Sequence, residues 1–393
     1  MPDYKNLKDE FSSYVTEVRR YLHAHPELSH EENETSLYLQ RELAKDGIPF
    51  RTCGKRFPWG ILAEIKGSTP GKTVLLRSDM DALPIEEKTG LPFASEAKGV
   101  MHACCHDTHM AMLLTAARML NRVKDELRGT VRILFEPSEE TGEGAADMLE
   151  GGCADGVDFA WSMHAWPALP AGRVSIEDGP RMGATDEFRV DVKGLPGHAA
   201  APHLSVDATL AAASIATALQ TIVSREVHPA STVVVTIGQL HSGTRWNVVS
   251  GDAFLDGTIR CFSEKDRKIA QDGITRVSES IARAHGCTAK ASFRWAADAV
   301  VNDPVVSSAA REAAADVLGA DALVSTPATL VGEDFAVIMD RVPSSFGFFG
   351  TGRTDGATSY PLHNERCSPD ESGLIKGALL HTAVAFRLLN GKA

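Results

Sequence analysis

Three short apolar runs, each followed by candidate metal ligands, constrain the fold of this chain more than any other sequence feature. The runs cover residues 73–77, 131–135 and 159–163. Runs of this kind are typical of strands that are buried on both faces of a parallel sheet. Helical stretches such as residues 110–120 lie between them, so we predict an α/β fold. In open α/β sheets, ligands bind at the carboxyl edge of the strands, which is where the candidate ligands fall.

The densest cluster of candidate ligands is residues 101–109, Met-His-Ala-Cys-Cys-His-Asp-Thr-His. Thiolate and imidazole groups are common ligands of zinc-like transition metals. Taken alone, Cys104 is equally well explained as a small buried apolar residue. Two thiols and three imidazoles within nine residues favour a metal site over simple packing.

Further candidates stand after the predicted strands and near the C-terminus. They are Asp79, Asp81, Glu139, Glu140, His164 and His363. Each has an ordinary explanation when taken alone, because adjacent acids often form a solvated turn and a lone histidine is often a hydrogen-bonded core residue. As one constellation they indicate a metal-dependent hydrolase. One carboxylate would bind metal while its neighbour takes a proton from water.

The length of the chain predicts two domains, because 393 residues exceed the size of most single cores. After Arg181, alternating apolar and charged residues predict a strand around residues 188–192. The predicted elements that follow are a helix at 206–223, strands at 232–237 and 253–261, a helix at 264–285 and a strand at 288–295. This β-α-β-β-α-β order is typical of the ferredoxin-like arrangement. We therefore predict a catalytic metal-binding domain of residues 1–184 and 296–393, with an inserted domain of residues 185–295.

Two polar residues of the inserted domain stand out. His198 lies in a loop of small residues, where packing explains it poorly, although a plain turn remains an alternative. Arg260 lies in a predicted strand. It either pairs with an acid on the sheet surface or clamps a substrate carboxylate.

Composition and charge limit which binding partners and which cellular compartment we expect for the protein. A net charge of −12 argues against nucleic acid, whose phosphates need clustered Lys and Arg. The N-terminal segment has no signal-peptide pattern, and no apolar run is long enough to span a bilayer. Seven scattered cysteines do not resemble a disulfide framework. We therefore predict a cytoplasmic protein with no nucleic-acid or membrane partner.

Six motifs together resemble a known enzyme family. They lie at residues 76–87, 102–107, 136–140, 197–203, 332–335 and 362–364, in the family's order. The chain resembles the aminoacylase/carboxypeptidase-G metallopeptidase family along almost its whole length. Within that family it is most similar to the branch of hippurate hydrolases, auxin-conjugate hydrolases and N-acetyl-diaminopimelate deacetylases.

The resemblance implies a catalytic domain with a central mixed sheet flanked by helices, and an inserted dimerisation (lid) domain. It implies two divalent ions per subunit, with manganese or zinc first and cobalt or nickel as alternatives. The implied metal ligands are Cys104, His106, Glu140, His164 and His363. The expected assembly is a homodimer or a dimer of dimers.

The resemblance also implies the catalytic roles. Glu139 would be the general base, and Asp81 would orient a metal-binding imidazole. His198 would stabilise the oxyanion in the active site of the partner subunit. The implied substrate-binding residues are Asn247, Arg260 and His203.

The expected reaction is hydrolysis of the amide bond of N-acyl amino acids by a hydroxide bridged between two metal ions. A metallo-dipeptidase or carboxypeptidase of the same fold is an alternative. A catalytically silent protein that binds small acyl amino acids is an alternative of another class. A thiol-redox role for Cys104 and Cys105 is the third, which the absence of a Cys-x-x-Cys motif disfavours.

The chain departs from the family pattern at several positions. Cys105 stands where glycine is usual, and Glu136 stands where glutamine is usual. Arg245 and Trp246 replace small and Phe-like residues, which predicts an unusual substrate pocket. His363 is followed by Asn-Glu-Arg-Cys rather than Asn-Pro, which leaves the ligand itself intact.

Overall fold

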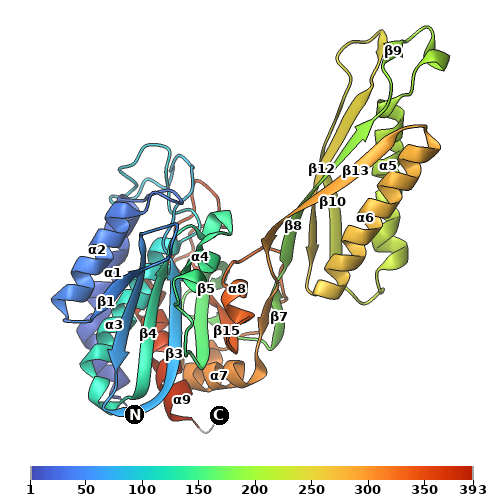
Figure 1. Cartoon of the computed structure of the whole chain (residues 1–393). Coiled ribbons are helices and arrows are strands. Elements are labelled where there is room, and N and C mark those ends of the chain that lie inside the picture. Colours follow the sequence, from blue (N-terminus) through green and yellow to red (C-terminus); the bar gives the residue numbers. More distant parts are fainter. Residues whose placement is uncertain (1, 392–393) are drawn as a thin grey trace. The chain divides into compact units, whose positions relative to one another are not determined.

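The computed structural model describes residues 2–391 and divides the chain into two compact units, labelled by element in Figure 1. The first unit, the catalytic unit, holds the described residues up to Arg181, Val301–Pro327 and those from Asp334 onward. The second, the inserted unit, holds Met182–Val300 and Ala328–Glu333. The chain therefore leaves the first unit, builds the second, and returns.

A seven-stranded mixed sheet forms the centre of the catalytic unit, in the order β1-β2-β4-β3-β5-β15-β6. Its strands are β1 (Phe50–Cys53), β2 (Gly60–Lys66), β3 (Thr69–Asp79), β4 (Arg128–Glu136), β5 (Phe159–Pro170), β6 (Val174–Ser175) and β15 (Ser344–Gly352). The adjacent strands β4, β3, β5 and β15 run parallel, whereas the β1–β2, β2–β4 and β6–β15 pairs are antiparallel. The three apolar runs of the sequence lie in β3, β4 and β5, so the predicted α/β class is confirmed.

Helices flank this sheet, as Figure 1 shows. They are α1 (Tyr4–Ala24), α2 (Asn33–Lys45), α3 (His106–Arg122), α4 (Gly144–Glu150), α7 (Pro304–Leu318), α8 (Ala336–Met339) and α9 (Leu374–Asn390). The most deeply buried are α3 and α9, which pack against each other. Both are buried on nearly every side, as expected of helices inside a large core.

One helical stretch, Glu371–Asn390, is long and apolar enough to cross a membrane by length and composition. This corrects the expectation that no segment reaches that length. However, 83% of its most apolar window is buried inside the protein. Because its apolar residues already pack in the core, the stretch has the character of a central core helix.

The inserted unit is a four-stranded antiparallel sheet with the order β10-β12-β8-β13. Its main elements are β8 (Ala184–Lys193), α5 (Ala208–Thr221), β10 (Val233–Ser242), β12 (Asp252–Cys261), α6 (Glu264–Ala284) and β13 (Thr288–Ala297). Helices α5 and α6 pack on the sheet and form its core. The predicted ferredoxin-like arrangement is confirmed, because the chain order β-α-β-β-α-β produces this sheet.

Short strands complete the fold. A separate two-stranded ladder of the inserted unit joins β9 (Gly197–His198) to β11 (Val248–Val249). The chain enters the inserted unit within β7 (Gly179–Met182) and leaves it within β14 (Val300–Asn302), and the short segment Ala328–Glu333 belongs to the inserted unit again.

Candidate metal centre

The structure gathers the candidate ligands of the catalytic unit at the carboxyl edge of its parallel strands. Parallel strands end at the same edge of a sheet, so residues distant in sequence meet there. The residues brought together are Asp81, Cys104, His106, Glu139, Glu140, His164 and His363. His164 lies inside β5, which continues to Pro170, and not after a strand as the sequence analysis expects.

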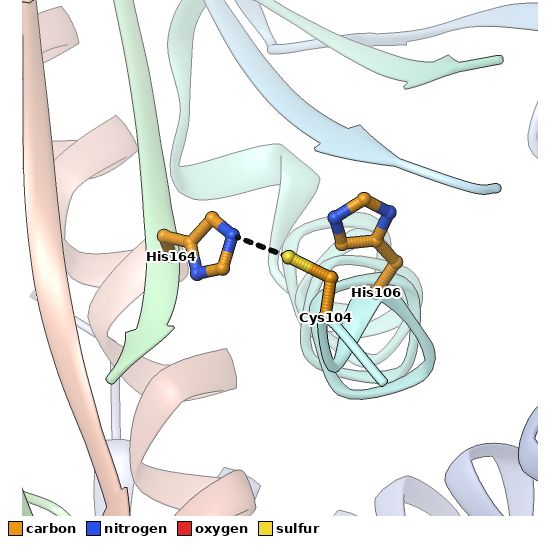
Figure 2. Close-up of side chains that lie close together, drawn as sticks. All are labelled: Cys104, His106 and His164. Carbon is orange, nitrogen blue, oxygen red and sulfur yellow. Dashed lines mark hydrogen bonds between the residues drawn. The ribbon is translucent and has the colours of Figure 1, made fainter. Parts of the chain in front are cut away.

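Cys104 is the centre of the first group of candidate ligands. Its Sγ atom lies 3.4 Å from Nε2 of His164, the contact drawn in Figure 2, and 3.3 Å from Nε2 of His363. A sulfur and a nitrogen that bind one tetrahedral zinc ion, at about 2.3 and 2.0 Å, lie roughly 3.5 Å apart. The two spacings therefore fit atoms that share one ion.

A second group surrounds Nε2 of His106, the first residue of α3. This atom lies 3.9 Å from carboxylate oxygens of Glu139 and of Glu140. Within residues 2–391, neither His106 Nε2 nor Glu140 Oε1 has a hydrogen-bond partner, although both are buried. A buried polar atom left without a hydrogen bond costs about 1–3 kcal/mol. A divalent ion would remove that cost, so the donor set fits a metal centre.

Hydrogen bonds fix the orientation of His106. Its Nδ1 atom lies 2.9 Å from the carbonyl oxygen of Asp81 and 3.2 Å from that residue's carboxylate. An Nδ1–H donor to these oxygens leaves the Nε2 lone pair free for a metal. Burial opposes the ionised carboxylate of Asp81, but the bond to His106 still holds its pKa below the usual value.

A three-residue relay orients His164. Its Nδ1 lies 2.8 Å from the carbonyl oxygen of Ala165, and the N–H of Ala165 donates to Nε2 of His109 at 2.7 Å. His109 Nδ1 in turn lies 2.6 Å from the Asp79 carboxylate. Burial is the main cause that lowers the pKa of His164, followed by the charge of His109. The relay leaves Nε2 of His164 as the atom that faces Cys104.

The turn that presents Glu139 is held by the side chains of two other acids, Glu32 and Asp81. Ser138, with a left-handed φ of 63°, donates its N–H to Oε1 of Glu32 at 2.7 Å. Glu140 donates its N–H to the Asp81 carboxylate at 3.1 Å. Burial of Glu32 and the charge of Asp81 raise the pKa of Glu32 to about 8. The backbone on both sides of Glu139 is therefore fixed by the carboxyl groups of Glu32 and Asp81.

Beneath the centre lies a buried ionic network that the sequence analysis missed. Arg77, 1% exposed, donates to both carboxylate oxygens of Glu136, and to Asp79 at 2.8 Å and Asp334 at 2.9 Å. Asp334 also accepts the N–H of Ala145. The sequence signals were the acids Asp79, Glu136 and Asp334 within the motifs, and Arg77 within an apolar strand, because arginine is almost never fully buried unless paired.

The predicted substrate residues lie in the inserted unit, at two places. His198 is in β9, and the N–H of the next residue, Ala199, donates to the carbonyl oxygen of Asn247 at 3.1 Å. His203 lies close by in sequence, in the short helix η3 (Pro202–Leu204). His198 and Asn247 are thus brought together.

Arg260 lies elsewhere, near the far end of β12. Its guanidinium donates to the hydroxyls of Thr185 and Thr258. No ion pair with an acid is found for it among the described residues, so the surface-pair alternative is not what the structure contains. The other end of β12, Asp252, pairs with Lys193 at the end of β8 that leads to β9. Eight residues of strand separate the two ends, which is roughly 26 Å.

Comparison with known proteins agrees with this geometry. The sequence model of peptidase family M20/M25/M40 matches residues 75–387. The chain belongs to this family. N-acetyl-L-cysteine deacetylase of Bacillus subtilis (strain 168) is 39% identical over 374 residues, which cover 95% of this chain and 88% of that protein. Thermostable carboxypeptidase 1 of Saccharolobus solfataricus is 37% identical over 98% of both chains.

A solved structure of the M20 family has the same fold. The Bacillus subtilis YXEP protein, described as a dinuclear metal-binding peptidase of this family, superposes with a TM-score of 0.86 and 34% identity. The match covers 97% of this chain and 99% of that chain. The family and fold expected from the sequence motifs are therefore confirmed.

Proposed function

We propose that this chain is a metal-dependent amidohydrolase that cleaves the amide bond of N-acyl amino acids. The observation that supports it most directly is the convergence of Cys104, His106, Glu140, His164 and His363, in which His106 Nε2 and Glu140 Oε1 are buried without a hydrogen-bond partner. A carboxylate that the ligand set does not need, Glu139, lies beside them. The similar Bacillus protein is named for removing an acetyl group from N-acetyl-L-cysteine, which is an N-acyl amino acid.

Two divalent ions would be held by these five ligands. When bound, they would lower the pKa of water and polarise an amide carbonyl. The mixture of thiolate, imidazole and carboxylate suits manganese or zinc, with cobalt and nickel as alternatives. Asp81 would orient His106, and Ala165 would orient His164, through the hydrogen bonds described above.

Glu139 would act as the general base and then as the general acid. Its carboxylate, 3.9 Å from His106 Nε2, takes a proton from the attacking water and returns it to the leaving amine. Its position is fixed through Ser138 by Glu32, so little motion is needed for either transfer. His198 would stabilise the oxyanion, and Asn247, Arg260 and His203 would bind the substrate.

The distance within the inserted unit supports a dimeric active site. Arg260 lies roughly 26 Å along β12 from Asp252, and Asp252 is at the end of the strand that pairs with the residue of β8 leading to β9 and His198. An N-acyl amino acid is about two residues long, or roughly 7 Å. One chain cannot place both groups on the same substrate. We therefore assign Arg260 to its own subunit's substrate and His198 to the site of the partner subunit, in a homodimer or dimer of dimers joined by the inserted unit.

Trp246 is in keeping with this arrangement. The side chain next to Asn247 is 89% exposed. A large aromatic residue gains free energy when it is removed from water, and aromatic residues are enriched at interfaces. Contact with a second subunit would cover it.

The cytoplasm is the proposed compartment. All seven cysteines are free and buried, as expected of a protein from a reducing environment. We assign no role to nucleic acid or membrane.

The test of the function is the Glu139→Gln variant. We expect it to keep its metal and its substrate affinity but to lose about 10²- to 10⁴-fold in kcat, because only the proton transfer is removed. Turnover would be measured on N-acetyl, N-benzoyl and long-chain N-acyl amino acids, with unblocked dipeptides for comparison, and bound metal by elemental analysis.

The matched control is Glu143→Gln, a half-exposed acid in the same loop with a side chain 45% exposed. It should leave kcat unchanged. Near-normal turnover by metal-loaded Glu139→Gln protein would overturn the assignment of the base. Turnover of dipeptides alone would identify a peptidase in place of an amidohydrolase.

A further inference from the structure

Two thiols from opposite parts of the sequence meet beside the metal centre. The Sγ atoms of Cys105 and Cys367 lie 3.5 Å apart although 262 residues separate them. Their exposed fractions are 0% and 1%. They belong to a small apolar cluster with Met101, Ala103 and Ala165, so the pair is shielded from water. Neither thiol has a part in the proposed mechanism.

The backbone at Cys105 is strained. Its φ of 66° lies in the left-handed region, which costs an L-residue about 1–2 kcal/mol and costs glycine almost nothing. A thiol at this position therefore has a cost that a glycine would avoid. Strained positions of this kind persist where the surrounding structure compensates and are concentrated at functional sites. The hydrogen-bond partner of the Cys105 thiol is Cys367.

The pair joins the two segments that supply Cys104 and His363. Cys105 follows Cys104 directly and caps α3, and Cys367 follows His363 by four residues. The backbone between the segments is also bonded, because His363 donates its N–H to the carbonyl oxygen of Ala103 at 2.8 Å. Any change in the Cys105–Cys367 distance therefore moves both segments at once.

We propose that Cys105 and Cys367 are a modification site, which hydrogen peroxide converts to a disulfide that weakens metal binding. Peroxide oxidises one thiol to a sulfenic acid and releases water. The second sulfur then displaces a second water from the sulfenic acid and forms the S–S bond. Overall the two thiols lose two electrons and two protons, and one peroxide becomes two waters.

The expected effect on the metal centre follows from distance. The S–S bond length is about 2.05 Å, so the sulfur atoms must approach by roughly 1.5 Å. In the reduced structure, Cys104 Sγ and His363 Nε2 are 3.3 Å apart, already near the spacing of two ligands on one ion. Closing the neighbouring thiols displaces these segments from that spacing. This effect on the enzyme rests on the proposed function, whereas the cross-link itself does not.

Cys104, the other thiol near this pair, is a poorer partner for disulfide formation. A bridge between the adjacent Cys104 and Cys105 would be strained, and Cys104 Sγ faces His164 and His363. Burial of both Cys105 and Cys367 predicts that oxidation is slow, and that it proceeds when the loop around Cys367 opens locally.

The experiment treats metal-loaded, full-length protein with hydrogen peroxide. Non-reduced peptide mapping detects the 105–367 cross-link, thiol titration in denaturant counts free cysteines, and elemental analysis measures retained metal. We expect the count to fall from seven to five, and metal retention and turnover to fall about tenfold or more. Reduction with dithiothreitol, removal of the reductant and addition of the same metal should restore both. The Cys105→Gly and Cys367→Ala variants should show none of these changes. Cys287→Ala, a buried thiol of the inserted unit, is the matched control and should respond as wild type.

Three results would overturn the proposal. The first is no 105–367 peptide in peroxide-treated wild-type protein. The second is a cross-link that leaves metal content unchanged. The third is loss of metal from Cys367→Ala protein at the wild-type rate, which would identify oxidation of Cys104. Inactive Glu139→Gln protein should cross-link and release metal as wild type does, so failure of the proposed function is distinguishable from failure of this proposal.

Discussion

His109 is not one of the five proposed metal ligands, yet we expect its loss to weaken metal binding. Its imidazole joins the Asp79 carboxylate, at 2.6 Å, to the N–H of Ala165, at 2.7 Å. The carbonyl oxygen of Ala165 lies 2.8 Å from Nδ1 of His164. In His109→Leu protein the Ala165 peptide loses its anchor, and the His164 ring loses its fixed direction.

The structure sets the expected magnitude. Loss of a group that orients a metal ligand typically costs 10- to 100-fold in metal affinity, or about 1.4–2.7 kcal/mol. The buried N–H of Ala165 is also left without an acceptor, which costs a further 1–3 kcal/mol or so of folding stability. Asp79 keeps the bond from Arg77 to its Oδ2 atom, although its Oδ1 atom loses the bond from His109. Metal affinity should therefore fall while the fold survives.

Competition with a chelator would measure the dissociation constant of the metal, and kcat would be measured at saturating metal. We expect the constant to rise 10- to 100-fold and kcat to change less. His109→Gln should recover part of the affinity, because its amide can both donate and accept. His381→Leu, which removes another fully buried histidine, is the matched control and should leave the constant unchanged. A constant within twofold of wild type in His109→Leu protein, or an equal change in His381→Leu protein, would refute the relay.

Three further predictions follow from the geometry. Cys104→Ala should lose metal and activity, whereas Cys105→Gly should keep both, because glycine relieves the backbone strain at the φ of 66°. The opposite result in elemental analysis would show that Cys105 is the ligand. Mixing inactive His198→Ala and Glu139→Gln proteins should restore roughly a quarter of wild-type activity per subunit, because half of the dimers would contain one complete site. No recovery after demonstrated subunit exchange would show that His198 does not act across the dimer. Burial raises the pKa of Glu32 to about 8, so the folded state holds a proton that the unfolded state releases above about pH 4.5. The free energy of unfolding should therefore fall as the pH rises from about 5 to 8. In urea titrations, Glu32→Gln should reduce the slope of this free energy against pH by up to about 1.4 kcal/mol per pH unit. An unchanged slope would contradict a protonated Glu32.

Much of the fold follows from local pattern. The apolar runs at residues 73–77, 131–135 and 159–163 lie in β3, β4 and β5, because a strand covered on both faces needs apolar residues throughout. The alternation of apolar and charged residues at 188–192 predicts β8, because a strand with one buried and one solvated face needs apolar residues only at every second position. Strand length was less predictable, because β5 continues past the apolar run and contains His164.

The candidate site was predictable only in part. Residue types and motif order identify which residues belong to the metal centre, but not which hydrogen bonds orient them. The bond between His109 and Asp79 depends on how α3 packs against β3, which no local pattern encodes. The meeting of Cys105 with Cys367 likewise depends on a tertiary contact across 262 residues.

The strand order of the catalytic unit has a consequence for synthesis. Strand β15 (Ser344–Gly352) pairs with β5 on one side and β6 on the other, so the sheet stays open between them until the chain is nearly finished. The inserted unit, by contrast, has almost all of its residues once Val300 has emerged. Domains usually fold in the order in which the ribosome produces them. Here the second unit can close while the first still exposes the edge of β5, a site where a nascent chain can pair wrongly with another.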